Sequence, residues 1–155
     1  MPSTDLVATA ARIARREHAG QVDKSGADYI THLARVATSV RTRGGTADQI
    51  ATAWLHDVLE DCPVTAADLA AEAIPGNVIE AVVAMTKTRR EPLDAYCARV
   101  KANPIALMVK AADIDDNTDP ARVATLDEPT RTRLATKYAK ARALLGITAD
   151  PSDPA

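Results

Sequence analysis

The sequence predicts an all-α protein, folded as a single domain of about eight helices. Apolar residues recur with helical periodicity along most of the chain, and no segment shows the convincing alternation that a half-buried strand requires. Aromatic residues make up only 3% of the 155 residues, and phenylalanine is absent. A core must therefore be built from alanine, leucine, valine and isoleucine, which favours closely packed helices over a sheet sandwich. A chain of this length is ordinary for one domain.

The first three helices are indicated by the residues that cap or end them. Ser3 or Thr4 can cap the first helix, and Thr46 can cap the third. Gly44 and Gly45 end the second, because glycine readily adopts the backbone conformation that closes a helix. A loop with two glycines, at 20–28, separates the first helix from the second. We therefore expect helices at 3–19, 30–43 and 46–61.

Five further helices follow. Thr65 begins a short one, and Gly146 closes the last. Prolines open two of them, at 92–103 and 104–117, at first-turn positions, where the missing N–H has no helical partner to lose. We expect these helices at 65–73, 75–86, 92–103, 104–117 and from 127 or 128 to 145. Residues 1–146 then form one domain, and 147–155, "ITADPSDPA", a disordered C-terminal tail.

Charge and composition disfavour several classes of function. The net charge of −2 gives no case for nucleic acid or an anionic membrane as the main partner. No apolar segment reaches the ~18 residues that span a bilayer, and the N-terminus lacks the apolar core of a signal peptide. Cys62 and Cys97 have no metal or redox spacing, so we expect reduced thiols. The sequence thus indicates a cytoplasmic protein with a small-molecule partner, and leaves open whether it forms a homo-oligomer.

The segment "WLHDVLED" (54–61) gathers groups that bind metals or transfer protons. At about 100° per residue its apolar members fall on one arc, and His56, Asp57, Glu60 and Asp61 fall on the opposite arc. A solvated surface helix would give the same pattern. Solvated faces, however, normally carry lysine or arginine at the i+4 positions, and none is present here. Taken alone, the segment fits either a wet helix face or a metal site.

The segment "PIALMVKAADIDDN" (104–117) begins apolar all round, which is typical of a buried helix. Asp113 lies at its inner end. A buried carboxylate without a partner costs several kcal/mol, so we expect Asp113 to be paired or bound to a metal. The structural alternative is a salt bridge to Lys110 or to an arginine elsewhere. Asn117 lies on the same face as Asp113, one turn later.

The histidines have both a structural and a functional interpretation. Taken singly, His18 fits a residue that anchors its loop, and His32 a hydrogen-bonded residue at the start of a core helix. Taken together with the acidic residues, the histidines supply two imidazoles and two carboxylates from three helices. Such a mixed set of nitrogen and oxygen donors suits Mn²⁺, Fe²⁺ or Zn²⁺. The set consists of His32, His56, Asp57 and Asp113.

Four segments, in order and at similar spacing, resemble the HD superfamily of metal-dependent phosphohydrolases, whose core motif is H…HD…D. They are "GQVDKSGADYITHLARVA", "AWLHDVLEDCPVTAADL", "AVVAMTKT" and "VKAADIDDNT". The chain resembles most closely the branch that contains the hydrolase domain of the Rel/Spo alarmone enzymes and the small stand-alone alarmone hydrolases. The resemblance implies an all-helical HD-type domain. It also implies Mn²⁺-dependent hydrolysis of the 3′-pyrophosphate of (p)ppGpp, giving GDP or GTP and pyrophosphate.

The resemblance assigns roles to residues near the expected metal. Glu60 and Asp61 match a pair that serves the attacking water. This role is chemically reasonable, because a divalent ion lowers the pKa of its bound water and a nearby carboxylate can orient that water or accept its proton. The resemblance implies four metal ligands, which are His32, His56, Asp57 and Asp113.

The resemblance also implies substrate-binding residues. Lys24 and Ser25 match a nucleotide-contacting loop, Asn117 matches a position near the ribose, and Lys110 matches a lysine close to the metal. A polyanionic substrate needs such cations beside an acidic cluster. Three more basic residues, for which a solvated loop is the simpler interpretation, are Lys87, Arg89 and Arg90.

Three positions depart from the family pattern. Asp28 and Leu33 stand where prolines are common, which changes the stiffness of the loop. Asp23 stands where the best-known members carry an arginine that can stack on guanine, whereas an aspartate cannot stack and would repel phosphate. Another nucleotide or phosphorylated metabolite is therefore an alternative substrate. A catalytically silent regulatory module is a further alternative, against which the complete donor set and the Glu60–Asp61 pair both count.

Overall fold

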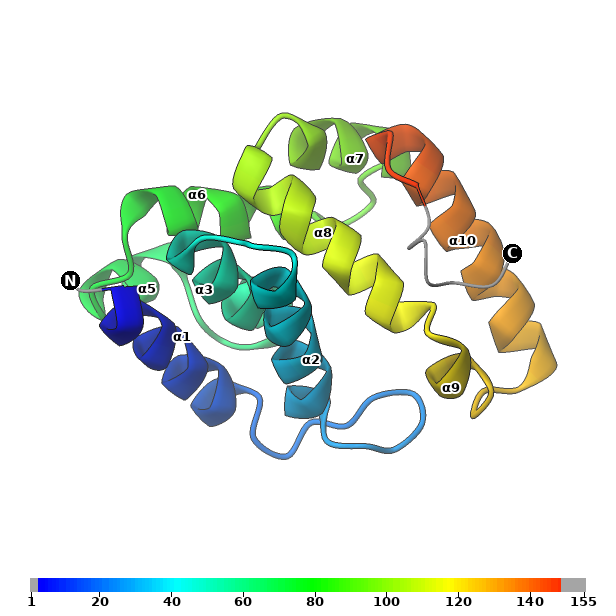
Figure 1. The fold of residues 1–155 in the computed structure, drawn as a ribbon, viewed down its shortest axis with the longest axis horizontal. Helices are drawn as coiled ribbons and strands as arrows, with labels where there is room; N and C mark the ends of the chain where they lie inside the picture. The colour runs from blue at the N-terminus through cyan, green and yellow to red at the C-terminus, as the bar shows by residue number, and fades with distance from the viewer. Residues whose placement is uncertain (1–2, 149–155) are drawn as a thin grey trace.

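The computed structural model describes residues 3–148, and within this range it contains ten helices and no strand (Figure 1). The all-α prediction is confirmed. None of these helices is long and apolar enough to cross a membrane. The helices are α1 (Ser3–Glu17), α2 (Tyr29–Thr42), α3 (Ala47–Leu55), α4 (Val58–Asp61), α5 (Ala66–Ala71), α6 (Gly76–Met85), α7 (Leu93–Lys101), α8 (Pro104–Asn117), α9 (Pro120–Val123) and α10 (Glu128–Leu145).

Helix α8 runs through the middle of the molecule and packs against α2, α3, α6, α7 and α10 (Figure 1). Near its C-terminal end, Asp115 forms an ion pair with Arg43, just after α2, and another with Arg142 of α10, 2.8 Å away. These contacts hold the N-terminal helices and the last helix to the same central element. The α8 residue Asp113, two positions earlier, is therefore fixed at the centre of the fold.

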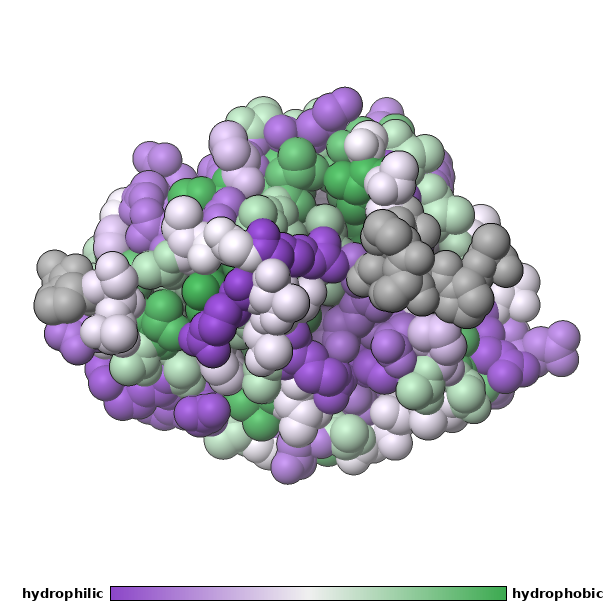
Figure 2. Space-filling view, in the orientation of Figure 1, coloured by the Kyte–Doolittle hydropathy of each residue, from purple (hydrophilic) through white to green (hydrophobic). Residues whose placement is uncertain are grey.

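The core is built from small and branched aliphatic side chains, as the composition predicts. Helices α1 and α3 pack against each other, and both carry fully buried alanines, among them Ala10, Ala14, Ala51 and Ala53. Small side chains let two helix backbones approach closely. On the outside, hydrophilic residues gather across the middle of one face, over α2, the end of α8 and α9 (Figure 2).

Local capping determines several helix boundaries. Thr46 accepts a hydrogen bond from the backbone N–H of Gln49, whose side chain bonds back to the Thr46 N–H. Thr65 and Asp68 form the same reciprocal pair at the start of α5. Gly146 closes α10 with a φ of 68°, in the left-handed region that favours glycine. The predicted boundaries at these residues are confirmed.

Two features raise the helix count above the predicted eight. The expected third helix is interrupted at His56–Asp57 and continues as α4, and the short helix α9 follows α8. At the C-terminus, Ile147 packs against the core, although it was expected to begin a disordered tail. The rest of that expected tail, from 149 onward, lies outside the described residues.

Candidate metal centre and adjoining cleft

The interruption between α3 and α4 brings two neighbouring side chains to one point. In a continuous helix, the side chains of His56 and Asp57 would diverge by about 100°. Asp57 instead has φ −104° and ψ 0°, and its Oδ2 lies 3.2 Å from His56 Nε2. The prediction of one continuous helix is therefore wrong. The alternative of a solvated helix face is also wrong for His56, whose side chain is only 2% exposed.

The predicted metal donors converge from three parts of the chain. His32 Nε2 on α2 lies 2.9 Å from Asp113 Oδ1 on α8, and His56 Nε2 lies 3.3 Å from the same oxygen. One donor atom from each of these three residues falls within 4.8 Å of the other two. Asp57 lies next to this group, because it contacts His56 Nε2. The Asp57 carboxylate also accepts a hydrogen bond from the Tyr29 hydroxyl.

Hydrogen bonds fix which nitrogen each histidine presents to the centre. His56 Nδ1 lies 2.7 Å from the carbonyl oxygen of Ala53, which only accepts, so Nδ1 carries the proton. His56 Nε2 is then a buried nitrogen without a well-formed hydrogen bond among the described residues, and the nearest acceptors are the oxygens of Asp57 and Asp113, at 3.2 and 3.3 Å. A buried polar atom that is not properly hydrogen-bonded is unusual in a folded protein. A neutral nitrogen that faces two carboxylates is in the position expected of a metal ligand.

His32 is oriented by a carboxylate behind it. Its Nδ1 lies 2.6 Å from Asp116 Oδ2, and Asp116 is itself held by Arg35, whose Nε lies 2.8 Å from Oδ1. A carboxylate bonded to the outer nitrogen of a histidine is the usual support of a metal-ligating imidazole. Both histidines therefore present Nε2 to Asp113, and the donor set fits a divalent ion.

The charges at this centre are strongly coupled. Burial opposes charge on either histidine, but the neighbouring carboxylates raise the pKa of His32, and they raise that of His56 well above its usual value. Burial likewise opposes ionisation of Asp113, yet Lys110 and the histidines hold its pKa well below the usual range. Although burial would raise the pKa of Asp57, His56 lowers it to about 2. The carboxylates are thus ionised, and a bound cation would displace the extra protons from the imidazoles. Such a set of donors is suited to a metal ion.

Asp113 contacts two of the predicted substrate-binding residues as well as the other candidate metal donors. Lys110 Nζ lies 3.0 Å from Asp113 Oδ2, and Asn117 Nδ2 donates to Oδ1 at 3.2 Å. The salt bridge between Asp113 and Lys110, considered from the sequence as a structural alternative, is therefore present. It does not replace the histidine contacts, because it uses the other oxygen of the carboxylate.

Glu60 and Asp61 lie beside the metal donors on the short helix α4. With Asp57 they form a second acidic group, in which one carboxylate oxygen of each residue lies within 4.8 Å of the others. Glu60 Oε1 accepts a hydrogen bond of 2.8 Å from the backbone N–H of Lys87. Partial burial is the main cause that raises the pKa of Asp61, and repulsion from Asp57 and Glu60 raises this pKa further. A raised pKa makes the Asp61 carboxylate a better proton acceptor than an ordinary aspartate.

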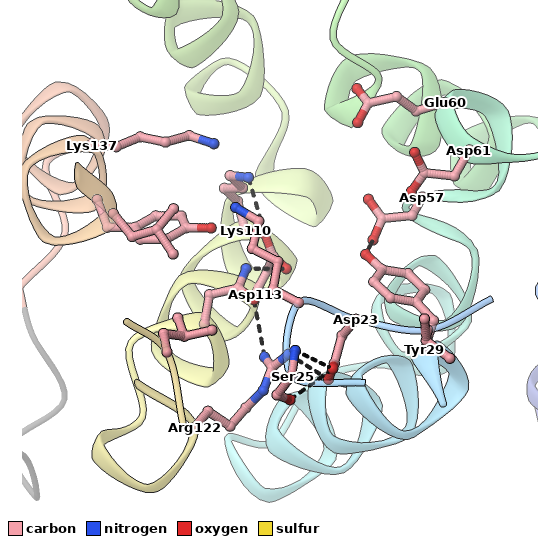
Figure 3. Close-up of a pocket in the computed structure, with 16 residues that line it drawn as sticks. Asp23, Ser25, Tyr29, Asp57, Glu60, Asp61, Lys110, Asp113, Arg122 and Lys137 are labelled. Atoms are coloured by element: carbon pink, nitrogen blue, oxygen red, sulfur yellow. Dashed lines mark hydrogen bonds and ion pairs between the residues drawn. The ribbon is translucent and has the colours of Figure 1, made fainter. Parts of the chain in front are cut away.

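A cleft of about 410 Å³ opens directly onto these groups (Figure 3). All four predicted substrate-binding residues line it, which are Lys24, Ser25, Lys110 and Asn117. On the opposite side, Figure 3 shows the carboxylates of Asp57, Glu60 and Asp61 facing the same space. The cleft is thus acidic on one wall and basic on the other.

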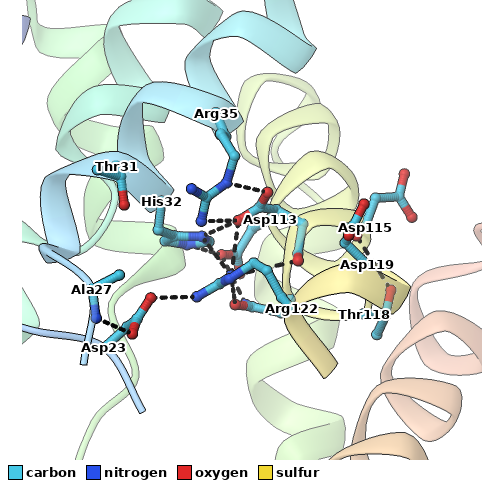
Figure 4. A network of polar contacts seen from close by, with 12 residues as sticks. Asp23, Ala27, Thr31, His32, Arg35, Asp113, Asp115, Thr118, Asp119 and Arg122 are labelled. Atoms are coloured by element: carbon cyan, nitrogen blue, oxygen red, sulfur yellow. Dashed lines mark hydrogen bonds and ion pairs between the residues drawn. The ribbon is translucent and has the colours of Figure 1, made fainter. Parts of the chain in front are cut away.

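The loop at 20–28 is organised by Asp23 (Figure 4). Asp23 Oδ1 accepts hydrogen bonds from the Ser25 N–H and hydroxyl, at 2.9 and 2.7 Å, and from the Ala27 N–H at 3.0 Å. Its Oδ2 lies 3.2 Å from Nη2 of Arg122 on α9. Burial would raise the pKa of Asp23, but these donors lower it. The negative charge at this position is therefore neutralised within the protein.

Several residues of the site are absent from the sequence-based prediction. Tyr29 and Asp116 lie three residues from His32 and Asp113 respectively, so helical spacing could have indicated them. Arg122, Lys137 and Tyr138 also line the cleft. No local pattern marks these three, because only the packing of α9 and α10 brings them there.

The fold and the donor set define a helical domain able to hold a divalent ion at the base of a polar cleft. The chain belongs to the HD domain family, whose model matches residues 10–150. Membership of this family implies a divalent metal ion. The resemblance noted from the four sequence segments is confirmed.

Curated relatives match part of the chain. The guanosine-3′,5′-bis(diphosphate) 3′-pyrophosphohydrolase of Vibrio cholerae is 39% identical over 75 residues, which is 48% of this chain and 10% of that protein. The bifunctional (p)ppGpp synthase/hydrolase SpoT of Escherichia coli is 40% identical over 57 residues, 37% of this chain and 8% of that protein. The chain thus spans about a tenth of the length of these relatives.

A solved structure shares the fold. It is described as a metazoan ortholog of SpoT that hydrolyzes ppGpp and plays a role in starvation responses. The TM-score is 0.76, with 90% of this chain and 85% of the other chain covered. At 19% identity the likeness concerns the arrangement of the helices.

Proposed function

We propose that this protein is a Mn²⁺-dependent hydrolase that removes the 3′-pyrophosphate of (p)ppGpp and releases GDP or GTP and pyrophosphate. The observation that carries the proposal is the position of the buried Nε2 of His56, which lies 3.2 Å from Asp57 Oδ2 and 3.3 Å from Asp113 Oδ1 at the edge of a nucleotide-sized cleft. The names of the matched relatives support the same activity, and the substrate follows from those names alone.

Four residues would hold the ion, namely His32, His56, Asp57 and Asp113. Two imidazoles and two carboxylates form a mixed donor set that suits Mn²⁺, with Fe²⁺ or Zn²⁺ as alternatives. When bound, such an ion lowers the pKa of a coordinated water and polarises the phosphate under attack. Asp116 would keep His32 in the required tautomer, and the Ala53 carbonyl would do so for His56.

Asp61 and Glu60 would handle the attacking water. Asp61, with its raised pKa, accepts the proton as the water oxygen bonds to the phosphorus next to the ribose. The bond between that phosphorus and the 3′ oxygen breaks, and the 3′ oxygen takes up the proton that Asp61 received, which restores the carboxylate. Glu60 is fixed through one oxygen by the Lys87 N–H, so its other oxygen is free to orient the water.

The larger cleft would receive the nucleoside diphosphate or triphosphate part of the substrate. Its volume of about 410 Å³ falls in the range of small-molecule sites. Lys24 and Lys110 supply positive charge, and Asn117 lies beside the metal donors. Asp23 does not add an unpaired negative charge, because Arg122 faces it.

A second candidate keeps the chemistry but changes the substrate. Position 23 provides an ion-paired carboxylate where a side chain able to stack on guanine would be expected. This observation favours a nucleotide with another base, or a phosphorylated metabolite. The metal centre and the Glu60–Asp61 pair would act on such a substrate in the same way.

Incubation of the purified protein with ppGpp and Mn²⁺, with products resolved by anion exchange, tests the proposal. The control is His56→Ala. GDP and pyrophosphate from the unsubstituted protein alone are the expected result. No turnover of ppGpp by a protein that demonstrably binds Mn²⁺ would overturn the alarmone assignment and favour the second candidate. Phosphate release from a panel of nucleotides would then identify the substrate.

A further inference from the structure

A second, smaller cavity of about 100 Å³ adjoins the metal donors. His56 and Asp57 line it on one side, and α7 and α10 close it on the other through residues that include Tyr96 and Ala141. We call it the small pocket. It shares Asp57, Glu60, Lys110, Lys137 and Tyr138 with the larger cleft. The two cavities therefore meet at the candidate metal centre.

The two cavities differ in what they can hold. A volume of about 410 Å³ lies within the range of small-molecule sites, whereas about 100 Å³ lies well below it. The small pocket is therefore too small to serve as a nucleoside site by itself. It has room for a compact group of phosphate size.

Three lysines surround the small pocket, which are Lys87, Lys110 and Lys137. The ring of Tyr96 lies among them, with Lys87 Nζ 5.9 Å and Lys110 Nζ 5.4 Å from its centroid. Asp113 neutralises Lys110. By contrast, within residues 3–148 no carboxylate lies at ion-pair distance from Lys87 or Lys137.

Lys137 projects from α10 towards the acidic wall (Figure 3). Partial burial lowers its pKa, and the nearby lysines Lys110 and Lys87 lower it further. Cations that repel one another without an acidic partner are stabilised when an anion binds among them. Lys87 is held in place at its backbone, because its N–H donates to Glu60. Within residues 3–148, the small pocket thus has two lysines without an acidic partner, close to the candidate metal donors.

We propose that the small pocket binds the diphosphate group that is cleaved from the substrate, through Lys87 and Lys137, while the nucleoside part occupies the larger cleft. This assignment rests on the proposed function, because it places the two products of that reaction in two cavities. The scissile phosphorus then lies at their junction, beside the metal donors and Glu60. The terminal phosphate lies deepest in the small pocket.

Binding of inorganic pyrophosphate to the Mn²⁺-loaded protein tests this inference, by calorimetry at a fixed free Mn²⁺ concentration. The variants are Lys87→Ala and Lys137→Ala. The matched controls are Arg89→Ala, a neighbour of Lys87, and Lys140→Ala, one turn from Lys137, and neither control residue lines either cavity. We expect each pocket variant to bind pyrophosphate about tenfold more weakly, which corresponds to the ~1.4 kcal/mol of one lost charge-assisted contact. The controls should match the unsubstituted protein.

GDP provides the second measurement. Lys87 lines the small pocket only, so Lys87→Ala should leave the affinity for GDP unchanged, and GDP and pyrophosphate should bind together. Unchanged pyrophosphate affinity in both pocket variants would overturn the inference. Mutually exclusive binding of GDP and pyrophosphate would overturn it as well, because one cavity would then serve both.

Failure of the inference is distinguishable from failure of the proposed function. Pyrophosphate binding needs no turnover, so a protein inactive on ppGpp can still bind pyrophosphate through Lys87. Conversely, a protein that hydrolyses ppGpp with equal pyrophosphate inhibition in all variants retains its function and loses the pocket assignment.

Discussion

Asp23 and Arg122 stand 99 residues apart in the sequence, yet Asp23 Oδ2 lies 3.2 Å from Arg122 Nη2. The contact ties the loop at 20–28 to α9. Arg122 Nη1 also lies 2.8 Å from Asp116 Oδ2, the carboxylate that supports His32. One guanidinium therefore links the loop that lines the cleft to the environment of a candidate metal ligand.

A double-mutant cycle on Asp23 and Arg122 tests this link. We expect Asp23→Asn and Arg122→Gln each to raise KM several-fold, because either change frees the loop. The double variant should be little worse than a single one, with a coupling of about 1 kcal/mol. Steady-state kinetics of the four proteins provide the measurement. Additive effects would show that the two side chains act separately.

Metal removal should destabilise the protein. Only the native state brings the four donors together, so an ion at about 100 times its Kd adds about 2.7 kcal/mol to the free energy of unfolding. For a domain of this size that corresponds to roughly 5–10 °C in Tm. We expect a chelator to lower Tm and Mn²⁺ to restore it, with no such response in His32→Ala. A Tm that is unchanged by the chelator and by Mn²⁺ would argue strongly against the metal site.

Asp116 should control metal affinity without being a ligand. Its carboxylate lies 2.6 Å from His32 Nδ1, so Asp116→Asn weakens the support of the imidazole. Losses of about 10–100-fold in metal affinity are usual for such partners. Asp5→Asn, at an exposed position on α1, is the matched control. Titration with Mn²⁺ measures the difference, and equal affinities in the two variants would contradict the assigned role.

Glu60 and Asp61 should matter for turnover rather than for metal binding. Asp61→Asn removes the proposed proton acceptor, and we expect kcat to fall by about 10²–10⁴-fold. Glu60→Gln should have a smaller effect, because the amide oxygen can still accept from the Lys87 N–H. Glu80→Gln, exposed on α6, serves as the control. An Asp61→Asn protein with full kcat would refute the proposed role.

The pH dependence of stability should reverse when the ion binds. In the metal-free protein the pKa values of His32 and His56 are raised above 6.5. Protonation of these two histidines therefore adds fully to the free energy of unfolding below pH 6.5, and this stabilisation is lost as the pH rises through the raised pKa values. An ion competes with these protons, so its affinity rises with pH. Between about pH 6 and pH 9, Tm should fall in chelator and rise or hold in Mn²⁺. Parallel curves in differential scanning calorimetry would contradict this.

Helix boundaries set by local chemistry could be predicted from the sequence. Thr46 and Thr65 cap their helices with partners three residues away, and Gly146 closes α10 by its own conformation. The interruption at His56–Asp57 could not, because no glycine or proline marks it. It depends on burial of His56 and on contacts with distant residues such as Tyr29.

The candidate site divides in the same way. The candidate metal donors could be proposed from the sequence, because two histidines and two aspartates stand out in apolar surroundings, and the structure brings them close together. Lys137 could not, because it lies on a helix rich in exposed charge, where nothing local separates it from Lys140. Only the packing of α10 against α7 and α8 directs one lysine into the cleft and leaves the other outside.

The lysines of the small pocket lie in a recess rather than along a ridge, so the phosphate binding proposed for it would depend on how the phosphate is attached to the rest of the ligand. A phosphate at the free end of a molecule has one substituent and can enter a space of about 100 Å³. A phosphodiester within a polymer is substituted on both sides and is held outside. Because the whole chain carries a net charge of −2, it offers a polymer no compensating attraction at long range. The small volume of the pocket would thus favour small, terminally phosphorylated molecules as ligands.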